Sequence, residues 1–301
     1  MTNQHKAYVF AAMTVLLWST VASAFKLSLR YMDPIQLLFF ANLVSVTTLF
    51  AILLIQKKLY LLRTYSRRDL MHSAMLGILN PFLYYLVLFK AYDLLPAQEA
   101  QPLNYTWAIT LTLLSIPLLK QRIATRQFLA ILISYLGVVI ISTRGDLLSL
   151  RFSNATGVAL ALGSTVIWAL YWIYNTKDQK DPVASLFLNF LFGLPFVFIA
   201  VVVLSELRIE HTLGLIGAAY VVLFEMSIAF VLWLNALRLA RTTASVANLI
   251  FFSPFLSLIF IHFLVGEKIL ASTLVGLMFI VAGNILQQFG KKPIQTAAVV
   301  D

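Results

Sequence analysis

The chain has 301 residues, of which 61% are hydrophobic and 11% are charged, whereas soluble domains usually carry about 25% charged residues. Its net charge of +10 is spread over short loops between apolar runs, which fits membrane orientation better than nucleic-acid binding. The lack of cysteine excludes disulfides, thiolate catalysis and iron–sulfur ligation. These features predict a multi-pass membrane protein.

Ten apolar segments are long enough for a membrane-spanning helix, which needs about 20 mostly apolar residues. In the first half of the chain they lie near residues 7–28, 34–55, 70–89, 97–119 and 127–143. In the second half they lie near 155–176, 182–205, 212–237, 242–265 and 269–289. We therefore expect an all-α membrane protein with ten transmembrane helices. Prolines inside the spans mark expected kinks: Pro81, Pro102, Pro117, Pro195 and Pro254.

The two halves begin alike. Trp18 is followed by Asp33-Pro34, and Trp168 is followed by Asp181-Pro182. Because each copy has five spans, an odd number, the copies must cross the membrane in opposite senses. Such inverted repeats are typical of secondary transporters, whose site lies near the bilayer midplane between the halves. The expected units are residues 1–146, residues 151–290 and a short cytoplasmic tail, 291–301.

The loop charges predict the orientation. With the N-terminus in the cytoplasm, the inner loops and tails hold 15 of the 22 Lys and Arg residues. The positive-inside rule then places both termini in the cytoplasm, and an even number of spans requires them to share a side.

Short motifs mark several spans. They are Leu17-Trp18-Ser19-Thr20 in the first span, Trp233 with Ala236-Leu237 in the eighth, and Ser253-Pro254 with Gly266-Glu267 around the ninth. In this order they resemble the EamA-like branch of the drug/metabolite transporter superfamily, over nearly the whole chain. The resemblance implies two inverted five-helix repeats that carry small metabolites across the bacterial inner membrane. It also implies a central site built from spans one, three, four, six, eight and nine.

The fourth and sixth spans resemble a subgroup that includes aromatic amino-acid exporters. The motifs are Pro96-Ala97-Gln98-Glu99-Ala100, Asn104-Tyr105-Thr106-Trp107 and Trp168-Ala169-Leu170-Tyr171. One position departs from the subgroup, because Ala108 follows the tryptophan where the subgroup often has proline.

Aromatic and amide side chains recur at helical spacing in two spans. Trp168, Tyr171, Trp172 and Asn175 share one face of the sixth span. The same spacing recurs in the ninth span, at Asn248, Phe251, Phe252 and Phe255. These faces predict a cavity with aromatic walls and a few amides, suited to a planar or apolar ligand with a polar head. Interhelical packing or an interfacial aromatic belt is the alternative interpretation.

The candidate substrate-binding residues come from spans one, three, four, six and nine. They are Trp18, Ser19, Asn80, Tyr84, Gln101, Asn104, Tyr105, Trp107, Trp168, Tyr171, Trp172, Asn175, Asn248 and Phe252.

Glu225 lies close to the centre of the eighth span, where an acid costs about 2.5–3.5 kcal/mol on insertion scales. We expect it to face the bundle interior, as a proton-coupling carboxylate or as the partner of a substrate ammonium. The alternative is a structural acid bonded to a neighbouring helix. Lys26 and Lys90 are expected to extend to the outer interface, although Lys26 could hold a substrate carboxylate. Glu99 could pair with either lysine.

Catalytic and cofactor signatures are missing. There is no Gly-rich phosphate loop or Gly-x-Ser-x-Gly elbow, and the four histidines show no metal-ligand spacing. The sequence therefore predicts no catalytic residues, no cofactor and no metal. The expected partners are a small-molecule substrate and the lipid bilayer, without nucleic acid, and the oligomeric state is left open.

The leading interpretation is a transporter that exports amino acids, with aromatic or hydrophobic ones favoured, or related metabolites by alternating access. A carrier of nucleosides or sugars, a membrane-embedded enzyme and a lipid flippase stay open. A polar basic groove facing the bilayer would favour the last two.

Overall fold

The computed structural model describes residues 2–120, 125–148, 152–175, 178–206, 211–240 and 248–288. Within these ranges all regular structure is helical and no strand occurs. Seven helical segments are long and apolar enough to cross a membrane, and three shorter apolar helices follow them.

The helices of the first half are α1 (Asn3–Ser28), α2 (Pro34–Ile55), α3 (Leu61–Thr64), α4 (Arg67–Gly77), α5 (Tyr84–Leu94), α6 (Ala97–Asn104), α7 (Trp107–Leu119) and α8 (Thr125–Ser142). Those of the second half are α9 (Ala155–Asn175), α10 (Pro182–Leu204), α11 (Thr212–Val221), α12 (Ile228–Leu239), α14 (Ser253–Phe260) and α15 (Ala271–Gln288). The predicted segment 34–55 coincides with α2, and 97–119 has the outer bounds of α6 and α7.

The Asp-Pro pairs start α2 and α10 as helix caps. The Asp33 carboxylate accepts hydrogen bonds from the backbone N–H groups of Ile35 at 2.8 Å and Gln36 at 3.0 Å. Asp181 does the same for the first turn of α10. These bonds satisfy backbone donors that have no partner within a helix, and the proline that follows loses nothing at the first helical position.

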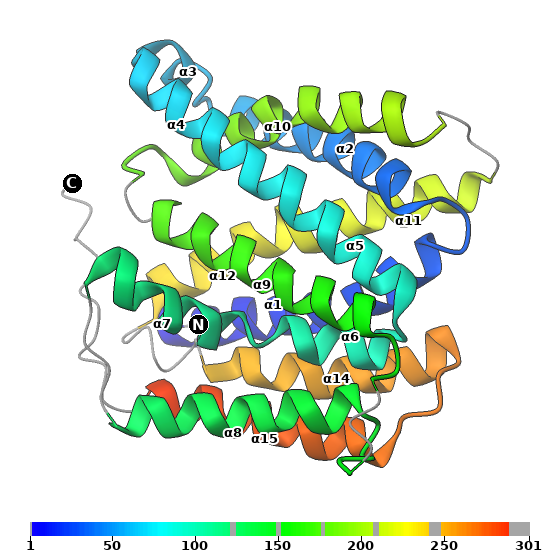
Figure 1. Cartoon of the computed structure of the whole chain (residues 1–301). Coiled ribbons are helices and arrows are strands. Elements are labelled where there is room, and N and C mark those ends of the chain that lie inside the picture. Colours follow the sequence, from blue (N-terminus) through cyan, green and yellow to red (C-terminus); the bar gives the residue numbers. More distant parts are fainter. Residues whose placement is uncertain are drawn as a thin grey trace.

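Helix pairs form the two flanks of the bundle. Figure 1 shows α2 beside α10 at the top and α8 beside α15 at the bottom, with the other long helices between them. Glycine allows α8 and α15 to approach closely, because a Cβ on Gly137 would lie 2.4 Å from the carbonyl oxygen of Gly276. At Gly283 it would lie 2.0 Å from the Ser134 hydroxyl oxygen. These glycines therefore have a packing role.

Four interruptions break the helices of the interior. A π-helical turn, Ile78–Leu83, separates α4 from α5, with Asn80 in a non-helical conformation (φ −145°, ψ 117°) directly before Pro81. A second π-helical turn, Val222–Ser227, separates α11 from α12. The fourth predicted span is broken between α6 and α7, and the described part of the ninth starts with a 3₁₀ helix, Asn248–Phe252, before α14. Interrupted helices at matching places in two halves are typical of the substrate sites of secondary transporters.

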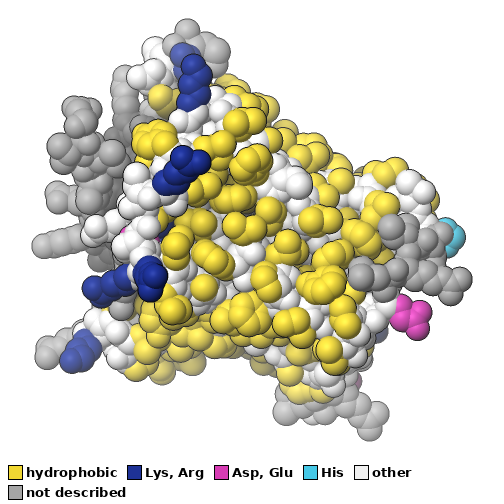
Figure 2. Space-filling view, turned by 90° about the horizontal axis from the view of Figure 1, so that it is seen from above, with side chains coloured by type: hydrophobic (Ala, Val, Ile, Leu, Met, Phe, Trp, Pro, Cys, Tyr) yellow, Lys and Arg dark blue, Asp and Glu magenta, His cyan; other side chains and the backbone are white. Residues whose placement is uncertain are grey.

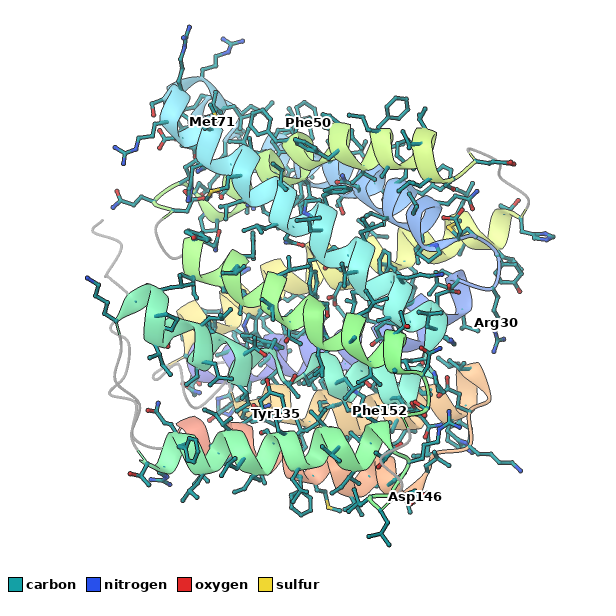
Figure 3. The ribbon with its side chains drawn as sticks, in the orientation of Figure 1. Arg30, Phe50, Met71, Tyr135, Asp146 and Phe152 are labelled. Atoms are coloured by element: carbon teal, nitrogen blue, oxygen red, sulfur yellow. The ribbon has the colours of Figure 1, made fainter. Side chains whose placement is uncertain are left out.

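The surface separates apolar and basic side chains. The face seen in Figure 2 is largely hydrophobic, and its Lys and Arg side chains gather along one edge. Large exposed side chains such as Phe50 and Met71, 44% and 74% exposed, lie on the outside of the bundle (Figure 3). Arg30, after α1, and Asp146, after α8, lie toward the end of the bundle opposite Met71 (Figure 3).

Candidate functional site

A stack of aromatic rings joins α5 to α9 in the interior. The rings of Tyr84 and Trp168 stack with centroids 4.5 Å apart, and Trp168 stacks in turn on Tyr171 at 5.4 Å. Trp172 meets the edge of Trp168 at 5.8 Å. We call Tyr84, Trp168 and Tyr171 the aromatic stack; it forms because α9 is a regular helix on which these positions share a face.

Polar side chains from three other segments bind the two ends of this stack. The Tyr84 hydroxyl donates to Asn104 Oδ1 at 3.4 Å, and Asn104 Nδ2 donates to the Ser164 hydroxyl at 3.0 Å. At the other end Asn189 Nδ2, on α10, donates to the Tyr171 hydroxyl at 3.5 Å. The Asn80 side chain, at the break between α4 and α5, also bonds to Tyr171. The stack therefore has hydrogen-bonded tyrosine hydroxyls at both ends.

A second polar and aromatic group surrounds α1. The ring of Trp18 lies 5.5 Å from that of Trp233, and its indole N–H donates to the backbone carbonyl of Glu225 at 3.5 Å. The Ser19 hydroxyl bonds to the Ser253 hydroxyl at 3.3 Å, at the start of α14. These contacts tie the first predicted span to the interruptions of the eighth and ninth.

Glu225 points toward the interior, as predicted from its position. It lies in the π-helical turn Val222–Ser227, and its side chain is within hydrogen-bonding range of the Tyr85 hydroxyl. Tyr85 is 1% exposed and contacts Tyr84 with ring centroids 4.8 Å apart. The carboxylate is therefore one residue removed from the aromatic stack.

Buried amide oxygens near these groups have no hydrogen-bond partner. They are the Oδ1 atoms of Asn80 and Asn189 and the Oε1 atom of Gln101. Their residues are 3%, 0% and 4% exposed. A buried acceptor without a partner carries a desolvation cost of about 1–3 kcal/mol. A ligand that brought hydrogen-bond donors to these oxygens would offset that cost.

Several other predicted site residues are only partly buried or are exposed. Trp107 is half-buried at the first residue of α7, and Asn175 is half-buried at the last residue of α9. Phe252 is 62% exposed, so its ring does not join the interior group. The 3₁₀ geometry of Asn248–Phe252 turns the chain by about 120° per residue, so positions four apart do not share a face. The side chain of Asn248 lies outside the described part of the structure.

The predicted pairing of Glu99 with Lys26 or Lys90 is wrong. Glu99 Oε1 accepts from Arg144 Nε at 2.8 Å, and Ser153 donates to the other carboxylate oxygen. Lys26 donates to the carbonyl oxygens of Tyr92 and Leu95 at 2.7 and 2.8 Å, and Lys90 pairs with Asp93 at 2.6 Å. Glu99 meets a loop arginine because α6 starts beside the loop that follows α8.

The Gly-Glu motif caps a helix of the other half. Glu267 accepts from the backbone N–H groups of Ala97 at 2.7 Å and Gln98 at 3.1 Å, at the first turn of α6. Gln98 in turn bonds the backbone of Lys268 and Leu270. The carboxylate compensates both the free N–H groups and the helix dipole.

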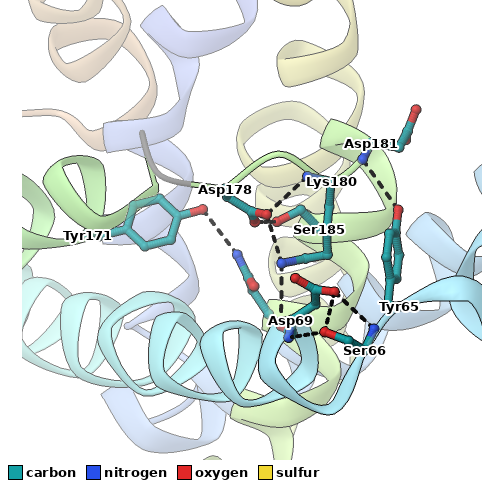
Figure 4. A network of polar contacts seen from close by, with 9 residues as sticks. Tyr65, Ser66, Asp69, Tyr171, Asp178, Lys180, Asp181 and Ser185 are labelled. Carbon is teal, nitrogen blue, oxygen red and sulfur yellow. Dashed lines mark hydrogen bonds and ion pairs between the residues drawn. The ribbon is translucent and has the colours of Figure 1, made fainter.

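A polar network closes the opposite end of the bundle (Figure 4). Lys180 Nζ lies 2.8 Å from Asp178 Oδ1 and donates to the Asp69 carbonyl at 3.4 Å. Ser185 donates to Asp178, and the Tyr65 hydroxyl accepts from the Asp181 backbone N–H at 3.3 Å. Burial alone would raise the pKa of Asp178, but its bonds from Lys180 and Ser185 hold that pKa below its usual range.

One cavity of about 420 Å³ opens on the side of the bundle. Its lining is mostly apolar: Asp33, Pro34, Ile35, Leu86, Val87, Lys90, Leu160 and Leu204. Its lysine is already paired with Asp93, so this cavity is not a polar basic groove. Among the described residues, no three His, Asp or Glu side chains come together in a way that would hold a metal ion.

Comparison with known proteins identifies the family. The EamA-like transporter family matches twice, at residues 5–143 and 155–287. The chain belongs to the EamA-like transporter family. It is 25% identical over 299 residues to an uncharacterized transporter of Clostridium kluyveri, covering 95% of this chain and 94% of that protein. An uncharacterized transporter of Archaeoglobus fulgidus is also 25% identical, over 92% of this chain and 96% of its own length.

The fold of this EamA-like transporter is also found in a solved structure. One crystal structure aligns with a TM-score of 0.65 at 19% identity and covers 94% of this chain and 96% of that one. The family and its apolar helices identify a multi-pass membrane protein. The family and the names of its relatives indicate a transporter rather than an enzyme.

Proposed function

We propose that this transporter moves amino acids or related small metabolites out of the cell, with aromatic and hydrophobic amino acids favoured. The aromatic stack, bonded at both ends to interior amides and serine, carries this proposal. Such a wall suits a planar apolar body, and the amides suit a polar head. The predicted candidates Trp18, Ser19 and Tyr105 are proposed as the wall that faces it.

We propose ten spans arranged as two inverted five-helix repeats, residues 1–146 and 151–290. The helix contacts support this arrangement. In the first half α1 packs against α11, α12 and α14, and in the second half α9 packs against α5, the π-helical turn Ile78–Leu83 and α7. The first span thus packs against the eighth and ninth, and the sixth against the third and fourth, so exchanging the halves converts one set of spans into the other, as repeats require. The two separate family matches agree with such a duplication.

The proposed location is the bacterial inner membrane, with both termini in the cytoplasm. The basic side chains gathered at one edge in Figure 2 support an inner face at that end. The buried pair of Lys180 and Asp178 would then close the cytoplasmic side. Arg144 and Glu99 would close the outer side.

Counterflow in proteoliposomes tests the substrate class. Vesicles loaded with one compound are assayed for uptake of a labelled compound from a panel of amino acids, nucleosides and sugars. Exchange of aromatic amino acids is expected; exchange of nucleosides or sugars alone, or of no amino acid, would contradict the proposal. The mostly apolar lateral cavity does not favour a flippase.

Matched variants test the site. Trp168→Ala removes the centre of the aromatic stack and Asn104→Ala removes the bond to Tyr84. Each is expected to raise the half-saturating concentration about fivefold, since aromatic contacts and hydrogen bonds contribute about 1 kcal/mol each. Phe252→Ala is the control, because that ring is 62% exposed and should leave exchange unchanged. Unchanged affinity in both site variants would assign these residues to packing.

The coupling role of Glu225 stays a prediction. The Tyr85 hydroxyl bonds to it, and the hydroxyls of Tyr84, Tyr92 and Tyr105 lie within range of its charge. If Glu225 exchanges a proton, Glu225→Gln removes the pH dependence of transport. A pH series on the variant that matches the wild type would refute this role.

A further inference from the structure

Glu225 has no cation beside it among the described residues. Its bonded neighbour is Tyr85, and its backbone carbonyl is held by Trp18. The basic groups nearest the interior are engaged at the two ends of the bundle. Lys26 donates to the backbone carbonyl oxygens of Tyr92 and Leu95, and Lys180 pairs with Asp178. A carboxylate at this depth therefore lacks the partner that buried acids usually have.

Glu225 lies next to the aromatic stack. It is half-buried, whereas Tyr84 and Tyr85 beside it are 4% and 1% exposed. Its side chain bonds to Tyr85, whose ring contacts that of Tyr84 with centroids 4.8 Å apart. A ligand bound at the carboxylate would therefore lie beside the aromatic stack.

The other unpaired side-chain groups of the interior favour a ligand that donates hydrogen bonds. The unpaired atoms of Asn80, Asn189 and Gln101 are amide oxygens, which accept. Fewer donors are unpaired: the indole N–H of Trp172 and the amide of Asn42, beside serine hydroxyls that can donate or accept. A protonated amine brings three donors and a positive charge, and it is attracted to the faces of aromatic rings. A ligand carboxylate would meet the like charge of Glu225 and more acceptors than donors.

We infer that the site recognises its substrate by a protonated amine held at Glu225, with the substrate's apolar body against Tyr84 and Trp168. This inference rests on the proposed transport function and narrows its substrate class to amines, with or without a carboxylate. The substrate carboxylate contributes nothing to affinity in this arrangement. Amines that lack it bind at least as well as the amino acid.

Equilibrium binding to the purified full-length protein in detergent, at one fixed pH, distinguishes recognition of the ligand's amine from recognition of its carboxylate. Labelled tryptamine is the ligand, and the competitors are tryptophan, indole-3-propionate and the neutral alcohol tryptophol. Tryptamine and tryptophan are expected to compete, and indole-3-propionate to compete at least about tenfold more weakly than tryptamine, since it lacks the charged hydrogen bond. Equal or stronger competition by indole-3-propionate would overturn the inference.

Substitutions of Glu225 test whether this residue binds the amine. Glu225→Gln is expected to weaken tryptamine binding at least about tenfold while leaving the affinity for tryptophol within about twofold. Glu225→Asp, which keeps the charge, is expected to retain part of the tryptamine affinity. The control is Glu206→Gln, at an exposed acid outside the interior, which should bind like the wild type. Unchanged tryptamine affinity in Glu225→Gln, or equal losses for amine and alcohol, would refute the role of Glu225.

Failure of this inference differs from failure of the proposed function. Suppose that amino acids exchange in proteoliposomes while indole-3-propionate and tryptophan displace tryptamine equally well. The proposed transport function is then supported and the amine site is refuted. If tryptamine binds through Glu225 while no amino acid exchanges, the amine site stands and amino-acid export falls.

Discussion

Replacing Lys180 by methionine would leave Asp178 as a buried carboxylate without a cation. Lys180 Nζ lies 2.8 Å from Asp178 Oδ1, and the two side chains are only 4% and 6% exposed. Removing one partner of a buried ion pair costs about 3–5 kcal/mol. Because Ser185 still donates to Asp178, we expect the lower end of this range, about 3 kcal/mol.

The chain offers a matched control in Lys58→Met. Lys58 lies 2.6 Å from Asp181, at nearly the same distance, but these side chains are 34% and 17% exposed. An exposed pair contributes about 0–1 kcal/mol, so this variant should lose no more than about 1 kcal/mol. Because both changes remove one lysine at the same end of the bundle, the difference between their losses of unfolding free energy measures the effect of burying the ion pair.

The assay is reversible unfolding of the purified protein in mixed micelles, compared at several pH values. The pKa of Asp178 is lowered in the folded protein because the bonds from Lys180 and Ser185 outweigh the effect of burial. Such a carboxyl stabilises the fold above its unfolded pKa of about 3.9, and the contribution is lost as the pH falls through the folded value. The difference in free energy of unfolding between wild type and Lys180→Met should be largest at pH 7 and should shrink below about pH 4. Equal losses in the two variants, or a gap that persists in acid, would refute the reasoning.

Two further changes test packing and capping by the same assay. Gly137→Ala places a Cβ 2.4 Å from a backbone oxygen of α15 and should lower the free energy of unfolding by about 1–3 kcal/mol. Its control is Gly163→Ala, whose Cβ would have nothing within 4 Å and which should be neutral or stabilising by up to about 1 kcal/mol. Equal effects of the two changes would contradict the close approach of α8 and α15. Glu267→Ala removes the cap of α6 and should lower the free energy of unfolding by about 1–2 kcal/mol. Its control, Glu206→Ala at an exposed acid, should change the free energy of unfolding by less than about 0.5 kcal/mol. An equal loss in the two variants would show that the cap contributes nothing.

The helices were predictable because apolar length and helix starts are local signals. Segment 34–55 was bounded correctly since Asp33 caps α2 and a proline follows it. The break in the third predicted span carried a signal as well, because Pro81 directly follows the non-helical Asn80. The break at Val222–Ser227 contains neither proline nor glycine, so nothing in the local sequence distinguished it from a continuous helix.

The contacts of the candidate site were predictable only where the helix is regular. Trp168, Tyr171 and Trp172 meet as their spacing predicts, because α9 keeps 3.6 residues per turn. Phe252 does not follow the same spacing, because its segment is a 3₁₀ helix. Asn189 was missed, although an amide inside an apolar span is itself a signal of a functional contact. The partner of Glu99 depends on which loop lies beside α6, and the spacing of residues along the sequence does not indicate which loop that is.

The cap on α6 has a consequence for how the protein is made. Ala97 and its capping residue Glu267 are separated by 170 positions in the chain, so at 5–20 residues per second the cap leaves the ribosome about 10–30 s after the helix it completes. During that interval the first turn of α6 must be satisfied by water, lipid head groups or an insertion factor. Expression of the first half alone should therefore give a fourth span whose first turn is labile, and adding the second half as a separate polypeptide should restore it.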